Sequence, residues 1–141
     1  MKKMCSFLIG IMLIGMTSWM MGCSKDSAPE NPTINTKEEA IVFSISPDPG
    51  ATVFSVIGAS QDFTITISSK LPTQGVTAKV TVTRELDGVV VFSQNLSTSF
   101  SSFNSSIQNL QNGVLCNASI KLASKSDSTN SSSKSFKLAR K

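Results

Sequence analysis

The sequence predicts an all-β protein, with a single antiparallel β-sandwich of about seven strands over residues 40–138. Three observations support this fold class. Apolar and polar residues alternate along several segments, which places one face of a strand on a core and the other in water. Turn-forming residues separate these segments at short intervals. No segment after residue 24 has a helical repeat of apolar residues.

The first 22 residues predict a secretory signal peptide. Lys2 and Lys3 give a positively charged start, and residues 7–21 form a mostly apolar run. Gly22, a small residue, then directly precedes Cys23. This three-part layout is typical of exported proteins, so we expect residues 1–22 to be removed.

The segment Met20-Met21-Gly22-Cys23 resembles the cleavage box of bacterial lipoprotein signal peptides. The resemblance implies cleavage between Gly22 and Cys23, lipid attachment to the Cys23 thiol, and acylation of the new amino terminus. Such an anchor needs no spanning helix, because each buried methylene contributes about 0.8 kcal/mol and two or more chains hold a protein stably at a membrane.

Two other interpretations of this segment stay open. The apolar run could be an uncleaved signal anchor, although its 15 residues are fewer than the roughly 20 that a spanning helix needs. It could also belong to an ordinary signal peptide that is cleaved elsewhere. Cys5 precedes the apolar run and cannot be the lipid site in this geometry.

Residues 23–39 predict a lipidated amino terminus followed by a flexible, disordered tether. This segment is polar, contains two prolines and the pair Glu38-Glu39, and has almost no apolar side chain. It cannot bury enough surface to offset the entropy of ordering it. Ser24 follows Cys23, and by resemblance to Gram-negative lipoprotein sorting this implies the outer membrane, on either its periplasmic or its external side.

Residues 40–138 carry the alternation that predicts strands. Serine and threonine dominate the outer positions, as suits strands. The inward positions are Ile41, Phe43 and Ile45; Phe63, Ile65 and Ile67; Ala78, Val80 and Val82; Cys116, Ala118, Ile120 and Leu122; and Phe136 and Leu138. Breaks are expected at 46–50, 70–75, 87–88 and 126–133, and these loops are the expected partner surfaces. Residues 139–141 predict a basic tail.

Residues 110–120 resemble the approach to the sixth strand of fibronectin type III and related immunoglobulin-like domains. The matching residues are Leu110, Gly113, Ala118 and Ile120. Cys116 stands where those domains have a tyrosine, so the hydrogen bond of that hydroxyl is absent. The resemblance implies an immunoglobulin-like sandwich but no particular function, because this architecture hosts many roles.

Charge and cysteine content exclude several classes of protein. The chain has 13 basic and 9 acidic residues, a net charge of +4, and removal of Lys2 and Lys3 with the signal leaves +2. With basic residues this scattered, we expect no nucleic-acid partner. Cys116 would be the only cysteine besides Cys23, which excludes a disulfide framework in the mature chain. Its place in a strand favours a small buried side chain over a reactive thiol.

The side-chain inventory predicts no enzyme activity, no cofactor and no metal site. The chain has no His and no Tyr. The usual general base and commonest metal ligand is therefore missing, and a Ser-His-Asp arrangement cannot be built. Glu85 and Asp87 could approach a cation or pair with Arg84, and exposed ion pairs of this kind carry little functional signal.

These observations predict a lipid-anchored envelope protein that acts as a non-catalytic binding or structural module. Its partners would be the membrane, through the anchor, and an envelope protein or a polysaccharide. The alternative is a carbohydrate-binding accessory lipoprotein at the cell surface. For that alternative, Phe100 and Phe103 would form an exposed ligand patch, whereas packing onto the sandwich is the competing interpretation.

Overall fold

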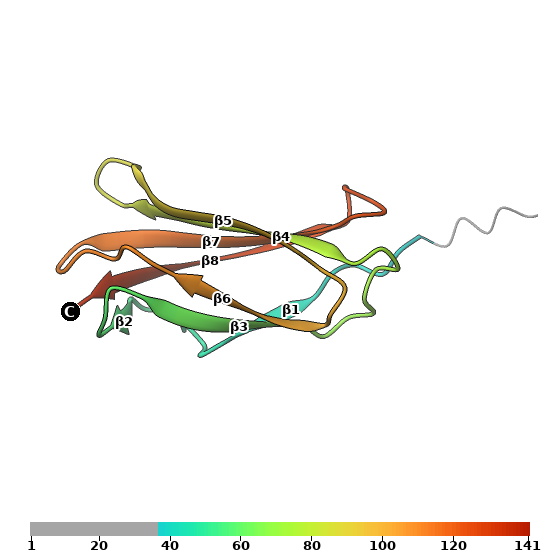
Figure 1. Ribbon diagram of the computed structural model, residues 1–141, viewed down its shortest axis with the longest axis horizontal. Helices are drawn as coiled ribbons and strands as arrows, with labels where there is room; N and C mark the ends of the chain where they lie inside the picture. The colour runs from blue at the N-terminus through green and yellow to red at the C-terminus, as the bar shows by residue number, and fades with distance from the viewer. Residues whose placement is uncertain (1–36) are drawn as a thin grey trace, which may run out of the picture. The chain divides into compact units, whose positions relative to one another are not determined.

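The computed structural model describes residues 37–141, which contain eight strands and no helix (Figure 1). This confirms the all-β class, with one strand more than the number expected. The predicted signal peptide, Gly22, Cys23 and most of the predicted tether lie outside the described residues. The strands are β1 (Phe43–Ser46), β2 (Phe54–Val56), β3 (Gln61–Ile67), β4 (Val76–Arg84), β5 (Val90–Thr98), β6 (Ser102–Ile107), β7 (Leu115–Ser124) and β8 (Ser131–Arg140).

The strands form two sheets that lie one over the other in a β-sandwich-like arrangement (Figure 1). The small sheet has the order β1-β3-β6, and the large sheet has the order β2-β8-β7-β4-β5. Neighbouring strands are antiparallel, except that β2 runs parallel to β8. The prediction of a wholly antiparallel fold is therefore wrong at this one pair. β2 is only three residues long, so no alternation marks it in the sequence.

The apolar faces of the two sheets meet in one hydrophobic core. Every inward residue predicted from the alternation is buried, from Ile41 through Leu138. Phe63 of β3 contacts Phe136 of β8 across the interface, with ring centroids 5.4 Å apart. Each fully buried side chain of this size contributes about 1.5–3 kcal/mol. This core therefore holds the two sheets together.

The predicted turns separate strands as expected, with one correction. The loop expected at 126–133 is shorter, because β8 already begins at Ser131. Ser131, Ser132 and Ser133 pair with Ala123, Leu122 and Lys121 of β7. A run of serines has no alternation of polarity, so only its pairing partner reveals it as a strand. β8 also continues to Arg140 and takes in two of the three residues expected in a basic tail.

Among the glycines of the described domain, Gly75 has the least room for a side chain. Its φ is +79°, a conformation that favours glycine. Its N–H donates to the Pro72 carbonyl at 2.8 Å, and its carbonyl accepts from the Lys125 N–H at 3.1 Å. An added Cβ would lie 2.3 Å from the Thr98 carbonyl oxygen. Through these contacts, Gly75 holds the loop before β4 against the last residue of β5 and the residue that follows β7.

We expect Gly75→Ala to lower the free energy of unfolding by about 3 kcal/mol or more, because the new methyl group collides with backbone. The matched control is Gly88→Ala, where φ is +69° and nothing lies within 4 Å of the added Cβ. That change should lower stability by only about 1–2 kcal/mol, the strain of the left-handed conformation. Urea unfolding of the full chain measures both values. Equal losses would contradict this account of Gly75.

Candidate functional site

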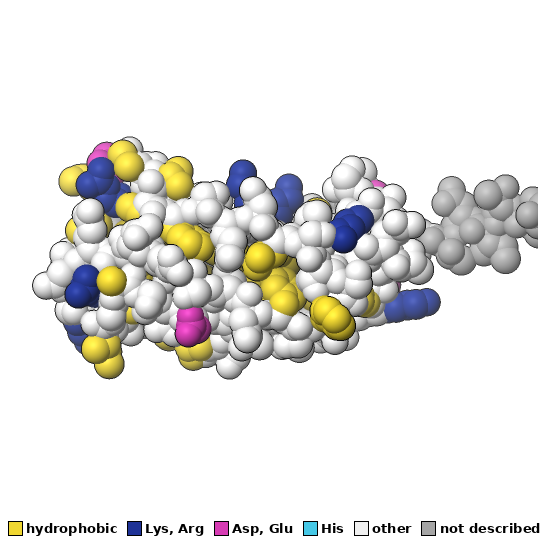
Figure 2. All heavy atoms as spheres, viewed as in Figure 1, with side chains coloured by type: hydrophobic (Ala, Val, Ile, Leu, Met, Phe, Trp, Pro, Cys, Tyr) yellow, Lys and Arg dark blue, Asp and Glu magenta, His cyan; other side chains and the backbone are white. Residues whose placement is uncertain are grey.

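A groove between β5 of the large sheet and β6 of the small sheet brings Phe100 and Phe103 together. It has a volume of about 510 Å³ and is also lined by Leu96, Asn104 and Lys125. Hydrophobic side chains reach the surface between these two strands (Figure 2). The two phenylalanines predicted to form a ligand patch therefore do lie beside one concave surface.

The two rings are placed differently within the groove. Phe100 lies in the turn between β5 and β6, where its N–H donates to the Thr98 hydroxyl at 3.0 Å, and it is 76% exposed. Phe103 lies on β6, opposite Ile65 of β3, and packs half-buried against the core. Phe100 is therefore exposed, as the ligand-patch interpretation expects, whereas Phe103 packs onto the sandwich, as the competing interpretation expects.

A hydrogen bond between the two sheets lies near the groove. Ser105 of β6 is buried, and its hydroxyl donates to the Gln94 Oε1 of β5 at 2.9 Å. Phe92 and Leu96 on β5 point toward the same interior and are only half-buried. Because Leu96 also lines the groove, the groove is a partly apolar surface next to the core.

The chemistry of this groove suits binding. The exposed Phe100 ring offers an apolar face on which a sugar ring or an apolar side chain can lie. The Ser97 and Ser99 hydroxyls and the Lys125 ammonium line the same groove and are hydrogen-bond donors. No acidic residue lines it, so it has no paired carboxylates for acid–base chemistry.

A second polar cluster lies where the chain enters the domain. The Ser126 hydroxyl and the Asn130 amide, the latter at 3.1 Å, both donate to the Glu38 carboxylate. The same amide group donates to the Glu39 carbonyl at 2.9 Å, and the Asn130 Oδ1 accepts from the Ile41 N–H at 3.1 Å. Glu38 and Glu39, which the sequence assigned to the tether, thus contact the loop between β7 and β8.

These hydrogen bonds change the acidity of Glu38. The Ser126 hydroxyl, helped by Ser124 and Asn130, holds the pKa of the Glu38 carboxyl below its usual range. Asp127 in the same loop accepts from the Thr129 hydroxyl at 2.6 Å and from the Thr129 N–H at 3.0 Å, which lowers its pKa as well. Both carboxylates therefore act as charged acceptors that order this end of the domain.

The acidic residues at the turn between β4 and β5 form ion pairs. Asp87 lies 2.8 Å from the Arg84 guanidinium, and Glu85 pairs with Lys137 of β8. The interpretation of Glu85 and Asp87 as surface pairs is therefore confirmed. Asp87 also accepts from the Val89 N–H at 3.1 Å, so it shapes the turn.

Cys116 is buried, as its strand position predicted, and is 1% exposed. Burial raises the pKa of its thiol. The side chain is therefore held as a neutral thiol inside the core, where it packs like a small apolar residue. Gly22 and Cys23, the predicted cleavage and lipidation residues, lie outside the described residues.

Among residues 37–141, no group of three or more His, Cys, Asp or Glu is placed to hold a metal ion. In that same part of the chain, no helix is long and apolar enough to cross a membrane. No protein-family model matches the chain, and no curated protein matches it.

We expect Glu38→Gln to lower stability at neutral pH and to make stability less dependent on pH. Because the pKa of Glu38 is lower in the folded state, its charged form favours folding above the usual range of a carboxyl group. This contribution to stability is lost as the pH falls from the usual carboxyl range through the lowered pKa of Glu38 in the folded state. The difference between wild type and variant, measured by urea unfolding over a series of pH values, should therefore shrink with acidification.

Asp62→Asn is the matched control, since the Asp62 side chain is exposed and accepts no hydrogen bond from residues 37–141. Its effect on stability should be small. If the loss in Glu38→Gln were the same at neutral and acidic pH, the assignment of a charged acceptor would be wrong.

Proposed function

We propose that this protein is a lipid-anchored envelope protein whose β-rich domain is a non-catalytic binding or structural module. The observation that carries the proposal is the position of Cys23 directly after Gly22 and an apolar run with a lysine-containing start. That arrangement is the one in which a lipoprotein signal peptidase cleaves. Ser24 after the cysteine favours the outer membrane as the destination.

The strand order supports an immunoglobulin-like architecture for the module. With the short β2 set aside, the first, second and fifth strands share one sheet and the third, fourth, sixth and seventh share the other. In immunoglobulin-type sandwiches the first, second and fifth strands likewise share a sheet opposite the third, sixth and seventh. Leu110 and Cys116, from the segment that carries the resemblance, are both buried in the core.

A binding or structural role agrees with the side-chain chemistry of the domain. The carboxylates of Glu38, Glu85, Asp87 and Asp127 accept hydrogen bonds or form ion pairs that shape loops. The Cys116 thiol is buried and neutral.

Lipid attachment predicts that radiolabelled palmitate enters the wild-type chain and not Cys23→Ser when each is expressed in a Gram-negative host. Cys5→Ser is the matched control, because it removes another cysteine of the same segment and should leave labelling unchanged. Labelling of Cys23→Ser, or no labelling of the wild type, would refute the anchor.

A carbohydrate-binding accessory role is the second candidate, and the exposed ring of Phe100 beside the groove favours it. In this role the domain would hold a polysaccharide at the cell surface. The ring would stack on the apolar face of a sugar, and Ser97 and Lys125 would donate hydrogen bonds to its oxygens.

If this role holds, Phe100→Ala should weaken retention of the detergent-solubilised chain on its polysaccharide by about five- to tenfold, the loss expected for one aromatic contact. Retention is measured on a panel of immobilised neutral polysaccharides. Leu86→Ala is the control, since Leu86 is 96% exposed but lies in the turn between β4 and β5. Equal retention of both variants, or no retention of the wild type, would reject this role.

A further inference from the structure

The outer face of the large sheet carries mostly short polar side chains. Because β8, β7, β4 and β5 pair in register, the residues of this face form rows across the four strands. The central row is Ser133, Lys121, Lys79 and Asn95; the rows beside it are Ser131, Ala123, Thr77 and Ser97, and Ser135, Ser119, Thr81 and Ser93. Within these three rows, long side chains rise only from Lys79 and Lys121; Lys137 lies one row beyond Ser135 and pairs with Glu85.

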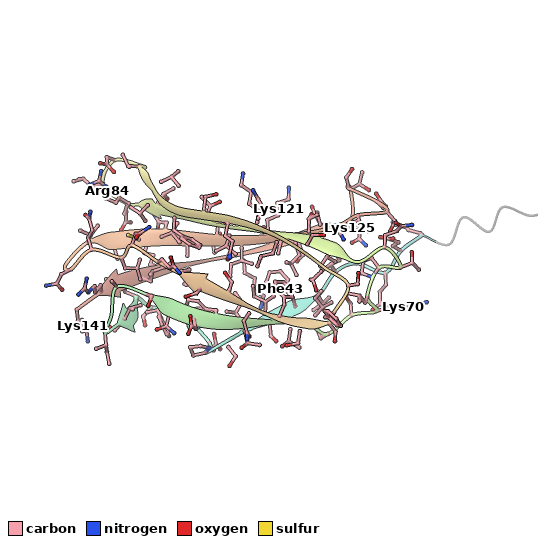
Figure 3. The ribbon with its side chains drawn as sticks, in the orientation of Figure 1. Phe43, Lys70, Arg84, Lys121, Lys125 and Lys141 are labelled. Atoms are coloured by element: carbon pink, nitrogen blue, oxygen red, sulfur yellow. The ribbon has the colours of Figure 1, made fainter. Side chains whose placement is uncertain are left out.

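Lys79 of β4 and Lys121 of β7 are direct cross-strand partners. Side chains in such positions start about 5 Å apart, and like charges placed there destabilise a sheet. The rows contain no Asp or Glu, and neither lysine forms a salt bridge with any residue of 37–141. The Lys121 side chain extends away from the core (Figure 3). The domain thus holds two neighbouring positive charges that its own described residues do not neutralise.

A hollow lies beside the lysine pair. Its volume is about 470 Å³, and Lys79 and Lys121 line it together with Thr77, Ala123 and Asn95. Ala78, Leu96 and Ser97 complete its lining, so the two lysines stand beside a partly apolar hollow. Two lysines and no carboxylate line this hollow, whereas Glu38 and Glu39 line the hollow that holds Lys37 and Lys70.

We propose that this face binds an acidic polysaccharide, with Lys79 and Lys121 holding its carboxylate or sulfate groups. A bound anion would relieve the repulsion between the two ammonium groups. The surrounding Ser, Thr and Asn side chains donate and accept hydrogen bonds, as the hydroxyl groups of a sugar require. The rows of short side chains leave room for a polymer that lies across the strands.

The same observations disfavour other polyanions. The rows contain no aromatic side chain on which a nucleic-acid base could stack. They also contain no large exposed apolar side chain that could enter a bilayer. The hollow adjoins the Phe100 groove, because Leu96 and Ser97 line both, but Lys79 and Lys121 line only the hollow. The site does not depend on the lipid anchor, so its failure would leave the proposed function intact.

The test measures binding of the detergent-solubilised full chain to immobilised polygalacturonate, which offers carboxylates, and to dextran sulfate, which offers sulfates. Uncharged dextran and single-stranded DNA serve as comparison polymers. The wild type should bind at least one acidic polysaccharide more tightly than either comparison polymer, and binding should weaken as salt is raised. Lys79→Gln with Lys121→Gln should weaken binding about fivefold for each lysine lost.

The matched control is Lys37→Gln with Lys70→Gln, which removes the same charge from exposed loop positions. That variant should bind acidic polysaccharide as the wild type does. Unchanged binding by the Lys79 and Lys121 double variant, equal loss in the loop control, or tighter binding of DNA would each overturn the proposal.

Thermal unfolding separates a binding role from a structural one. The double variant should melt at the same temperature as the wild type or higher in low salt, because it removes a repulsive pair. Lys121→Glu replaces the repulsion with an attraction, so it should also remain folded while losing binding. A lower melting temperature in both variants would mean that the lysines support the fold, and would overturn the proposal.

Discussion

The burial of one apolar face from each sheet is the interaction on which the rest of this domain depends. Phe63 and Phe136 meet across that interface at 5.4 Å, and the side chains around them are almost fully buried. Because successive side chains of a strand point to opposite faces, this burial also decides which residues face water. A slip of one residue in any central strand would turn its apolar row outward, so the register is strongly specified.

The unequal size of the two sheets determines where the surface is concave. Three strands cannot cover five completely, so the inner side of β5 is left half-buried at Phe92 and Leu96. Phe103 closes part of this gap, and Phe100 stands exposed in the adjoining turn. The β5–β6 groove is thus a consequence of the packing of the core and needs no dedicated loop.

The outer face of the large sheet follows from the same alternation. Its residues do not pack into the core. Most of them are short and hydroxylated, and two lysines lie opposite each other. At the end of the domain where the chain enters, hydrogen bonds from Ser126 and Asn130 fix Glu38 to the loop between β7 and β8. The core therefore leaves two kinds of surface, one that orders the entry of the chain and one that is open to partners.

Alternation of polarity and the residue pattern of positions 1–23 are local properties, and the sequence by itself determined both. The inward rows from Ile41 to Leu138 and the turns between them were predictable because each depends on neighbouring residues. The lipid-site prediction at Cys23 rests on the same kind of local pattern. Only the tertiary structure decided that β2 pairs with β8, that Ser131–Ser133 belong to a strand, that Lys79 faces Lys121, and that Asn130 holds Glu38. These contacts join residues far apart in the chain, and their partners are chosen by the packing of the whole core, which no short segment encodes.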